Sequence, residues 1–164
     1  MSSPSSTDTG VYRDRLARAR AAMVHHGVDV LLVSVGRDLP YLTGYEAMPL
    51  ERLTMLVVPK DGDATLVIPR LEAPRVVEQP GVFTLLPWGE TENPVEITAG
   101  LVGAGAGRVA IGDTMWARFL VELLPLLPGA AYERAVGVMG DLRMKKDAAE
   151  IALLQRAGAA VDRI

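Results

Sequence analysis

The sequence contains no cysteine, so disulfide bonds, zinc sites built on thiolates and thiol nucleophiles are all excluded. Only two histidines are present, and aromatic residues make up 5% of the chain, too few to suggest a platform on which nucleic-acid bases stack. The 17 lysines and arginines stand against 20 aspartates and glutamates, a formal net charge of −3. Because nucleic acid and anionic membranes bind to clustered basic faces, we expect neither as a partner.

The sequence also lacks any apolar run near the roughly 20 residues that a transmembrane helix needs. Its first ten residues are small and polar, without the basic and apolar regions of a secretory signal. We therefore expect a cytoplasmic protein in which residues 1–10 form a disordered leader.

The chain does contain enough apolar material for one domain. Hydrophobic residues make up 49% of the 164 residues and charged residues 23%, a balance typical of globular proteins. A domain of this length buries roughly 70% of the surface that its unfolded chain exposes, so it can form a core without covalent cross-links.

Alternating helical and strand-like segments predict an α/β fold. Residues 11–26 place apolar side chains at helical spacing, with arginines on the other face, and Gly27 ends the pattern. The next run, 28–35, is almost continuously aliphatic, which is typical of a strand buried on both faces. Because Asp61 and Gly62 favour a hairpin, we expect a mixed sheet of about five or six strands with helices on both faces. Further strands are predicted at 53–58, 64–68, 83–86, 109–111 and 131–136, and helices at 70–78, 94–102 and 114–124.

Two groups of residues superficially suggest a cofactor or metal site. The glycines within 103–107 look like a dinucleotide-binding loop, but a predicted helix precedes them and a strand follows, the reverse of the required order. His25 and His26 are adjacent on a helix and point about 100° apart, so the pair cannot easily bind one metal ion. We interpret the first group as a connection and the second as a helix end.

A cluster of acids, Glu90, Glu92 and Glu96, surrounds Asn93, the predicted cap of a helix. Paired carboxylates perform acid–base chemistry when their surroundings differ. Acids at the start of a helix more often complement its dipole, and we favour that interpretation.

The ten residues Gly36–Tyr45 carry a charge pair, two tyrosines and a second glycine directly after the most apolar strand. The loops that contact ligands in α/β sheets follow the carboxyl ends of strands. The segment is therefore a candidate binding loop, while the alternative is that its tyrosines simply close the edge of the sheet.

The last segment of the chain predicts a helix that begins with Asp147 and Glu150, the pattern of a capping box. Its apolar stripe packs either against the same domain or against a partner that the sequence up to Ile164 does not include, and we favour the second alternative. The stripe consists of Ile151, Leu154, Gly158 and Val161, and the pattern is still running at the last residue.

Three segments of the sequence carry a resemblance to a known family. They are Tyr41-Leu42-Thr43-Gly44-Tyr45, the run 66–72 (LVIPRLE) and the run 141–151 (DLRMKKDAAEI). In this order they resemble the creatinase/prolidase family of Xaa-Pro dipeptidases, Xaa-Pro aminopeptidases and creatinases. The resemblance implies that residues 11–140 form the family's N-terminal domain, a mixed sheet with a ribonuclease-H-like arrangement.

The same resemblance implies that residues 141–164 are a linker and the first helix of a C-terminal "pita-bread" catalytic domain. In the family, that domain holds two divalent ions, usually manganese, cobalt or zinc, on two Asp, one His and two Glu. None of these ligands can be matched to a residue here. We therefore expect no catalytic residue, cofactor or metal ligand in this chain, and we expect it to be a piece of a longer enzyme.

Family members use this domain to dimerise and to cover part of the partner subunit's active site. The resemblance thus implies a homodimer, contact with the chain's own catalytic domain, and binding of short proline-containing peptides. A creatinase-like hydrolase of small amides and a non-catalytic peptide-binding module are the alternatives. The residues expected to contact substrate across the dimer are Arg37, Asp38, Tyr41, Tyr45 and Trp88.

Overall fold

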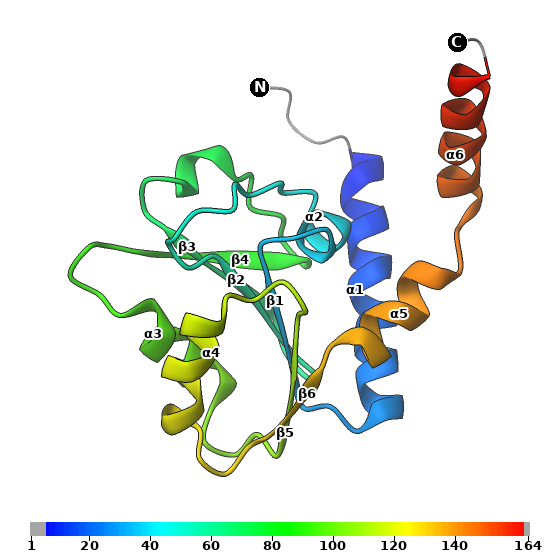
Figure 1. The fold of residues 1–164 in the computed structure, drawn as a ribbon. Coiled ribbons are helices and arrows are strands. Elements are labelled where there is room, and N and C mark those ends of the chain that lie inside the picture. The colour runs from blue at the N-terminus through cyan, green and yellow to red at the C-terminus, as the bar shows by residue number, and fades with distance from the viewer. Residues whose placement is uncertain (1–5, 163–164) are drawn as a thin grey trace.

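A six-stranded mixed sheet lies at the centre of the computed structural model, which describes residues 6–162 (Figure 1). The strand order is β4-β3-β2-β1-β5-β6. β2 runs antiparallel to both of its neighbours, and the remaining pairs are parallel, which confirms the predicted α/β fold with a mixed sheet. The strands are β1 (Val30–Ser34), β2 (Met55–Pro59), β3 (Ala64–Pro69), β4 (Phe83–Trp88), β5 (Arg108–Ile111) and β6 (Ala131–Arg134).

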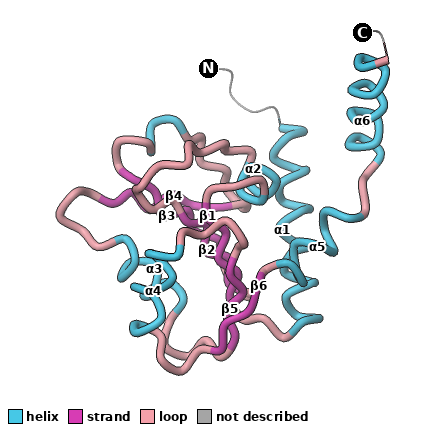
Figure 2. Tube along the Cα trace, in the orientation of Figure 1, coloured by secondary structure: helices cyan, strands magenta, loops and turns pink. Residues whose placement is uncertain are grey.

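Side chains of the central strand alternate between two apolar cores, as the uninterrupted run predicts. Leu31 and Val33 enter one core, while Val30 and Leu32 enter the other. The strands accordingly lie between two groups of helices (Figure 2). All five residues of β1 are buried, because neither face of the strand reaches solvent.

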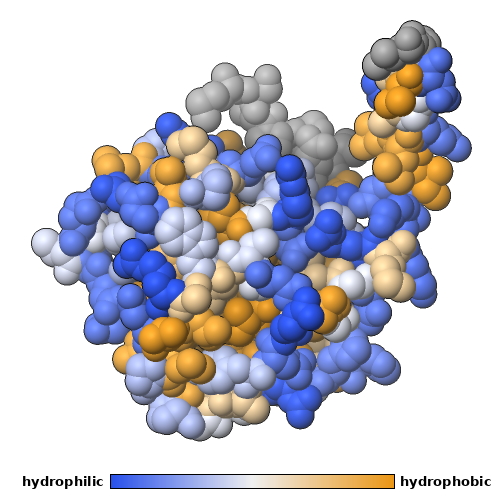
Figure 3. Space-filling model, viewed as in Figure 1, coloured by the Kyte–Doolittle hydropathy of each residue, from blue (hydrophilic) through white to orange (hydrophobic). Residues whose placement is uncertain are grey.

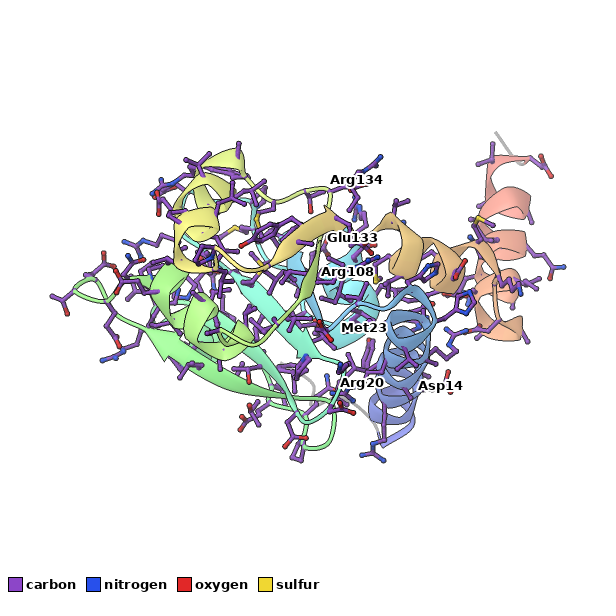
Figure 4. All side chains as sticks on the ribbon, turned by 90° about the horizontal axis from the view of Figure 1, so that it is seen from below. Asp14, Arg20, Met23, Arg108, Glu133 and Arg134 are labelled. Carbon is purple, nitrogen blue, oxygen red and sulfur yellow. The ribbon has the colours of Figure 1, made fainter. Side chains whose placement is uncertain are left out.

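Helices cover both faces of the sheet. α1, α2 and α5 pack on the first core, where Met23 of α1 is fully buried (Figure 4), and α3 and α4 pack on the second. Two short 3₁₀ turns, η1 (Ala73–Arg75) and η2 (Leu124–Leu126), complete the described elements. The helices are α1 (Ser6–His26), α2 (Asp38–Thr43), α3 (Pro94–Val102), α4 (Ala117–Leu123), α5 (Val136–Met144) and α6 (Ala148–Val161).

Both edge strands carry features that disfavour pairing with further strands. At β4 the outward N–H of Phe83 donates to the Gln79 carbonyl, that of Leu85 donates to the Glu78 carboxylate, and Pro87 has none. The opposite edge strand, β6, carries the charged residues Glu133 and Arg134 (Figure 4), which pair with Arg108 of β5 and with Asp113. Such features prevent edge-to-edge pairing between sheets.

Several boundaries differ from the predicted ones. α1 begins at Ser6, within the segment predicted as a disordered leader, and residues 1–5 lie outside the described residues. Apolar periodicity locates only positions that face the core, so it does not mark where a helix begins. The helix predicted at 70–78 shrinks to η1, because Pro74 would lie in its interior without an N–H for the helical hydrogen bond, and Val76 is already extended.

The predicted linker start at residue 141 falls inside α5. Val138, Met139 and Leu142 of this helix are buried in the first core, so residues 141–144 belong to the packed domain. The strand predicted at 131–136 is shorter than expected. It ends at Arg134, because α5 begins at Val136.

Among the described residues, no helix has both the length and the apolar character needed to cross a membrane.

Candidate functional site

The carboxyl ends of five strands lie at one edge of the sheet. β1, β5 and β6 are parallel, and two antiparallel pairings through β2 give β3 and β4 the same direction. The segment that follows β1 therefore lies at the edge where α/β sheets bind ligands. Gly36–Tyr45, the predicted binding segment, starts from this edge.

Most of that segment is a helix and not the expected loop. α2 spans Asp38–Thr43, and Gly44 ends it with φ +73° while donating its N–H to the Pro40 carbonyl at 2.8 Å. Pro40 fits because it lies in the first turn, where a missing N–H leaves no bond unmade. Aspartate, proline and glycine are typical of loops, and the same residues also begin and end short helices.

Tyr41 joins α2 to two other helices. Its hydroxyl donates to the Leu142 carbonyl of α5 at 3.2 Å and accepts from Arg18 Nη2 of α1 at 3.0 Å. The Arg15 guanidinium lies 4.1 Å from the centre of its ring. These contacts make Tyr41 a positioning residue for the carboxyl edge.

Asp38 and Arg37 face different surroundings. Asp38 Oδ1 accepts from Arg143 Nη1 of α5 at 2.7 Å, so its charge is already matched. The Arg37 side chain is 81% exposed, and its Nη1 lies 3.4 Å from Oε1 of Glu46, whose side chain is 79% exposed. Exposed pairs of this kind contribute little stability, so Arg37 can exchange this partner for another carboxylate.

Tyr45 connects α2 to the residues that follow β3. Its hydroxyl donates to Glu72 Oε2 at 3.1 Å, and burial together with the Glu72 charge raises the pKa of Tyr45 to about 12. The phenol therefore remains protonated at neutral pH. A cavity of about 480 Å³ opens beside it, lined by both the Tyr12 and Tyr45 rings and by Arg75.

Trp88 lies away from the other four predicted residues. It is the last residue of β4, only 8% exposed, and its side chain belongs to the second core. The indole N–H donates to the buried Leu53 carbonyl at 3.0 Å. The structure therefore brings Arg37, Asp38, Tyr41 and Tyr45 together around α2 and leaves Trp88 on the opposite face.

The arginines of α1 make contacts that the sequence pattern did not predict. Predicted to fill a solvent face, Arg15 and Arg18 instead reach Tyr41, and Arg20 donates to the Pro59 and Gly62 carbonyls of the β2–β3 hairpin. A charged residue on a helix is normally exposed, so its identity alone gives no signal of such contacts. Arg15 and Arg18 are three residues apart and therefore lie on one face of the helix, and this spacing is the sequence feature that indicates a shared partner.

The acid cluster has local partners. Glu92 accepts the Gly89 N–H at 2.6 Å, Glu90 pairs with Arg52 at 3.0 Å, and Asn93 caps α3 as predicted. The glycines within 103–107 connect α3 to β5, also as predicted.

Metal chemistry has no ligand set in the described part of the chain. Between residues 6 and 162, no three histidine, aspartate or glutamate side chains come together to hold an ion. His26 Nε2 instead lies 3.1 Å from Oδ2 of Asp141 in α5. The residues present do not fit a two-metal centre, so no catalytic step can be assigned to this chain through such ions.

The mixed sheet and the segment at the carboxyl ends of its strands define the class of this protein: it is an α/β domain that presents an anchored surface segment. The family model for the creatinase/prolidase N-terminal domain matches residues 15–145. The chain belongs to the creatinase/prolidase family, as its N-terminal domain.

Relatives of known sequence and structure agree with this assignment. A probable dipeptidase PepE of Mycobacterium tuberculosis is 35% identical over 160 residues, which cover 96% of this chain and 42% of the relative. The crystal structure of dipeptidase PepE from Mycobacterium ulcerans superposes with a TM-score of 0.85 at 41% identity, over 95% of this chain and 43% of that one. A prolidase from Thermococcus sibiricus gives a TM-score of 0.82 at 27% identity, over 93% and 42% of the two chains. The chain thus spans about two fifths of the length of these relatives.

Proposed function

We propose that this chain is the dimerisation and substrate-restricting domain of a metal-dependent peptidase that hydrolyses the bond before proline in short peptides. The observation that carries the proposal is the placement of Arg37, which is exposed at the carboxyl edge on a segment anchored by Asp38, Tyr41 and Tyr45. The similar proteins are named as dipeptidases and a prolidase, which favours a peptidase over a creatinase-like amide hydrolase.

A domain restricts peptide length when it places a wall and a charge where the substrate must end. Arg37 is a suitable charge, because a guanidinium binds a terminal carboxylate through two parallel hydrogen bonds. Asp38 is less suitable, because its carboxylate already forms an ion pair with Arg143. Under this proposal Arg37 contacts the substrate, while Asp38, Tyr41 and Tyr45 hold α2 in position, and Trp88 supports the sheet from the other face.

The dimer is part of the proposal, since Arg37 reaches substrate from the neighbouring subunit. α6, none of whose described residues is buried, leads from this domain to the catalytic domain, where the proposed metal ions are bound. Cytoplasmic location belongs to the same proposal.

The test compares substrates in the enzyme that carries this chain at its N-terminus. Purified with manganese, it should hydrolyse alanyl-proline, should act more slowly on an alanyl-prolyl tripeptide, and should leave creatine intact. Sedimentation equilibrium should give the mass of a dimer. Turnover of creatine in place of the dipeptide would support the amide-hydrolase alternative, and binding of proline peptides without turnover would support the non-catalytic module.

A further inference from the structure

We propose that Arg15 of α1 fixes the direction in which α6 leaves the domain, and that it acts through the carboxylate of Glu150. Arg15 is a positioning residue and not a catalytic one. The inference rests on the proposed function in one respect: there, α6 leads to the catalytic domain, so its direction determines where Arg37 lies relative to the substrate.

α6 has little else to hold it. It extends away from the rest of the molecule (Figure 1), and of residues 148–162 Glu150 is the single one that is not exposed. No side chain of α6 is buried within the described residues, so apolar packing holds this helix far less than it holds α1 and α5. Figure 3 shows hydrophobic residues at the surface of the protruding helix. Its exposed apolar side chains are Ile151, Leu153, Leu154 and Val161.

The Arg15 side chain is itself held firmly before it meets α6. It is only 15% exposed, its Nη1 donates to the Tyr41 carbonyl at 3.0 Å, and its guanidinium stacks on the Tyr41 ring. Tyr41 in turn is fixed by Leu142 of α5 and by Arg18. Because the guanidinium is planar, these contacts also fix the position of Nη2.

Nη2 donates to Glu150 Oε1 at 3.1 Å. The other carboxylate oxygen, Oε2, accepts the Asp147 N–H at 2.9 Å, while Asp147 accepts the Glu150 N–H at 2.8 Å, so the two residues form the predicted capping box. One carboxylate therefore links the first turn of α6 to α1. The Glu150 side chain is 21% exposed, so water competes with this ion pair less than with a surface pair.

Three residues, Lys145–Asp147, separate α5 from α6. Without the bond from Arg15, rotation about this short connection would let α6 take many directions. With the bond, the direction is set by the α1–α2–α5 group, which also carries the anchored segment with Arg37.

Spin labels can measure the direction directly, because the chain has no cysteine of its own. Ala117→Cys on α4 and Ala157→Cys on α6 place nitroxides at exposed positions of the 164-residue chain, and electron–electron double resonance gives the distribution of distances between them. We expect a narrow distribution. Glu150→Gln keeps an acceptor for the capping box and removes the charge that Arg15 binds. The ratio of molecules inside the original peak to those outside it should fall by about tenfold, as expected for the loss of one charge-assisted hydrogen bond.

Arg15→Met, which keeps an apolar stem on Tyr41, should broaden the distribution equally, and the double variant should broaden it no further. The matched control is Glu133→Gln, which breaks the ion pair with Arg108 far from α6 and should leave the distribution narrow. Urea unfolding of each variant checks that the domain is intact. An unchanged narrow distribution in Glu150→Gln, or a broad one in the parent, would overturn the proposal. Neither result depends on whether the enzyme cleaves proline peptides, so the two proposals fail separately.

Discussion

Replacing Tyr41 by phenylalanine removes one oxygen atom from the contact between α1, α2 and α5. α5 ends without a glycine cap, so its last carbonyls need other donors, and the Tyr41 hydroxyl supplies one of them to Leu142. A neutral bond of this kind contributes about 1 kcal/mol. The hydrogen bond from Arg18 to the hydroxyl involves a charge and would by itself be stronger. Because the Arg18 side chain is 39% exposed, water can take the place of the hydroxyl in the variant, so losing this bond should cost about 1 kcal/mol more.

Tyr41→Phe should therefore lower the free energy of unfolding by about 2 kcal/mol, which corresponds to about 4–8 °C in Tm for a domain of this length. Urea unfolding followed by tryptophan fluorescence measures the loss, since Trp88 reports on the core. Tyr132→Phe is the matched control: its hydroxyl makes one bond, to the Leu127 carbonyl, and its loss should cost about 1 kcal/mol. A loss in Tyr41→Phe no larger than in the control would refute the role of Tyr41 as the residue that joins the three helices.

Three further outcomes are expected. Gly44→Ala should destabilise the domain by about 2–4 kcal/mol, because φ is +73° and the new Cβ would lie 2.7 Å from the Tyr12 ring; Gly105→Ala, with open space around it, should change the urea midpoint little. Asp29 accepts from Lys60 and from the Gly107 and Arg108 N–H groups, which lower its pKa; its stabilisation is complete above its ordinary pKa of about 3.9 and is lost as pH falls through the lowered value. Asp29→Asn should thus be less stable than the parent at neutral pH by about 1–2 kcal/mol, with the difference shrinking in urea titrations below about pH 4, and a constant difference would contradict the assignment. Calorimetric titration of the 164-residue chain with manganese should give no submicromolar binding, because the described carboxylates do not converge; stoichiometric tight binding would show a ligand set that the structure lacks.

The sheet could be predicted because its signals are local. The run 28–35 contains the buried strand, Asp61–Gly62 lies in the predicted hairpin, and Asn93 and Asp147 begin their helices as predicted. In each case the neighbouring residues carry the physical cause: apolar faces, positive φ or a capping oxygen. α2 was missed because six residues are too few to show helical periodicity.

The contacts around α2 could not be predicted, because they join residues far apart in the chain. Tyr41 meets Leu142, Tyr45 meets Glu72, and each bond depends on the direction of strands that sequence periodicity does not specify. The predicted strand at 83–86 stops before Pro87, but proline is tolerated on an edge strand, so β4 continues through Pro87 to Trp88. The family resemblance identified these segments without giving their side-chain partners.

The most direct test of the central claim is the effect of Arg37 on substrate length in the enzyme that carries this chain. Arg37→Ala should lower kcat/KM for an Xaa-Pro dipeptide by roughly tenfold or more, the value of one charged hydrogen bond to a carboxylate, and should lower it much less for a tripeptide amide. Metal content should stay the same. Arg118→Ala replaces an arginine of α4 whose side chain is 55% exposed; this variant is the control and should retain the parent kinetics. Equal dipeptide kinetics in Arg37→Ala and the control would contradict the claim that this edge of the domain restricts the substrate.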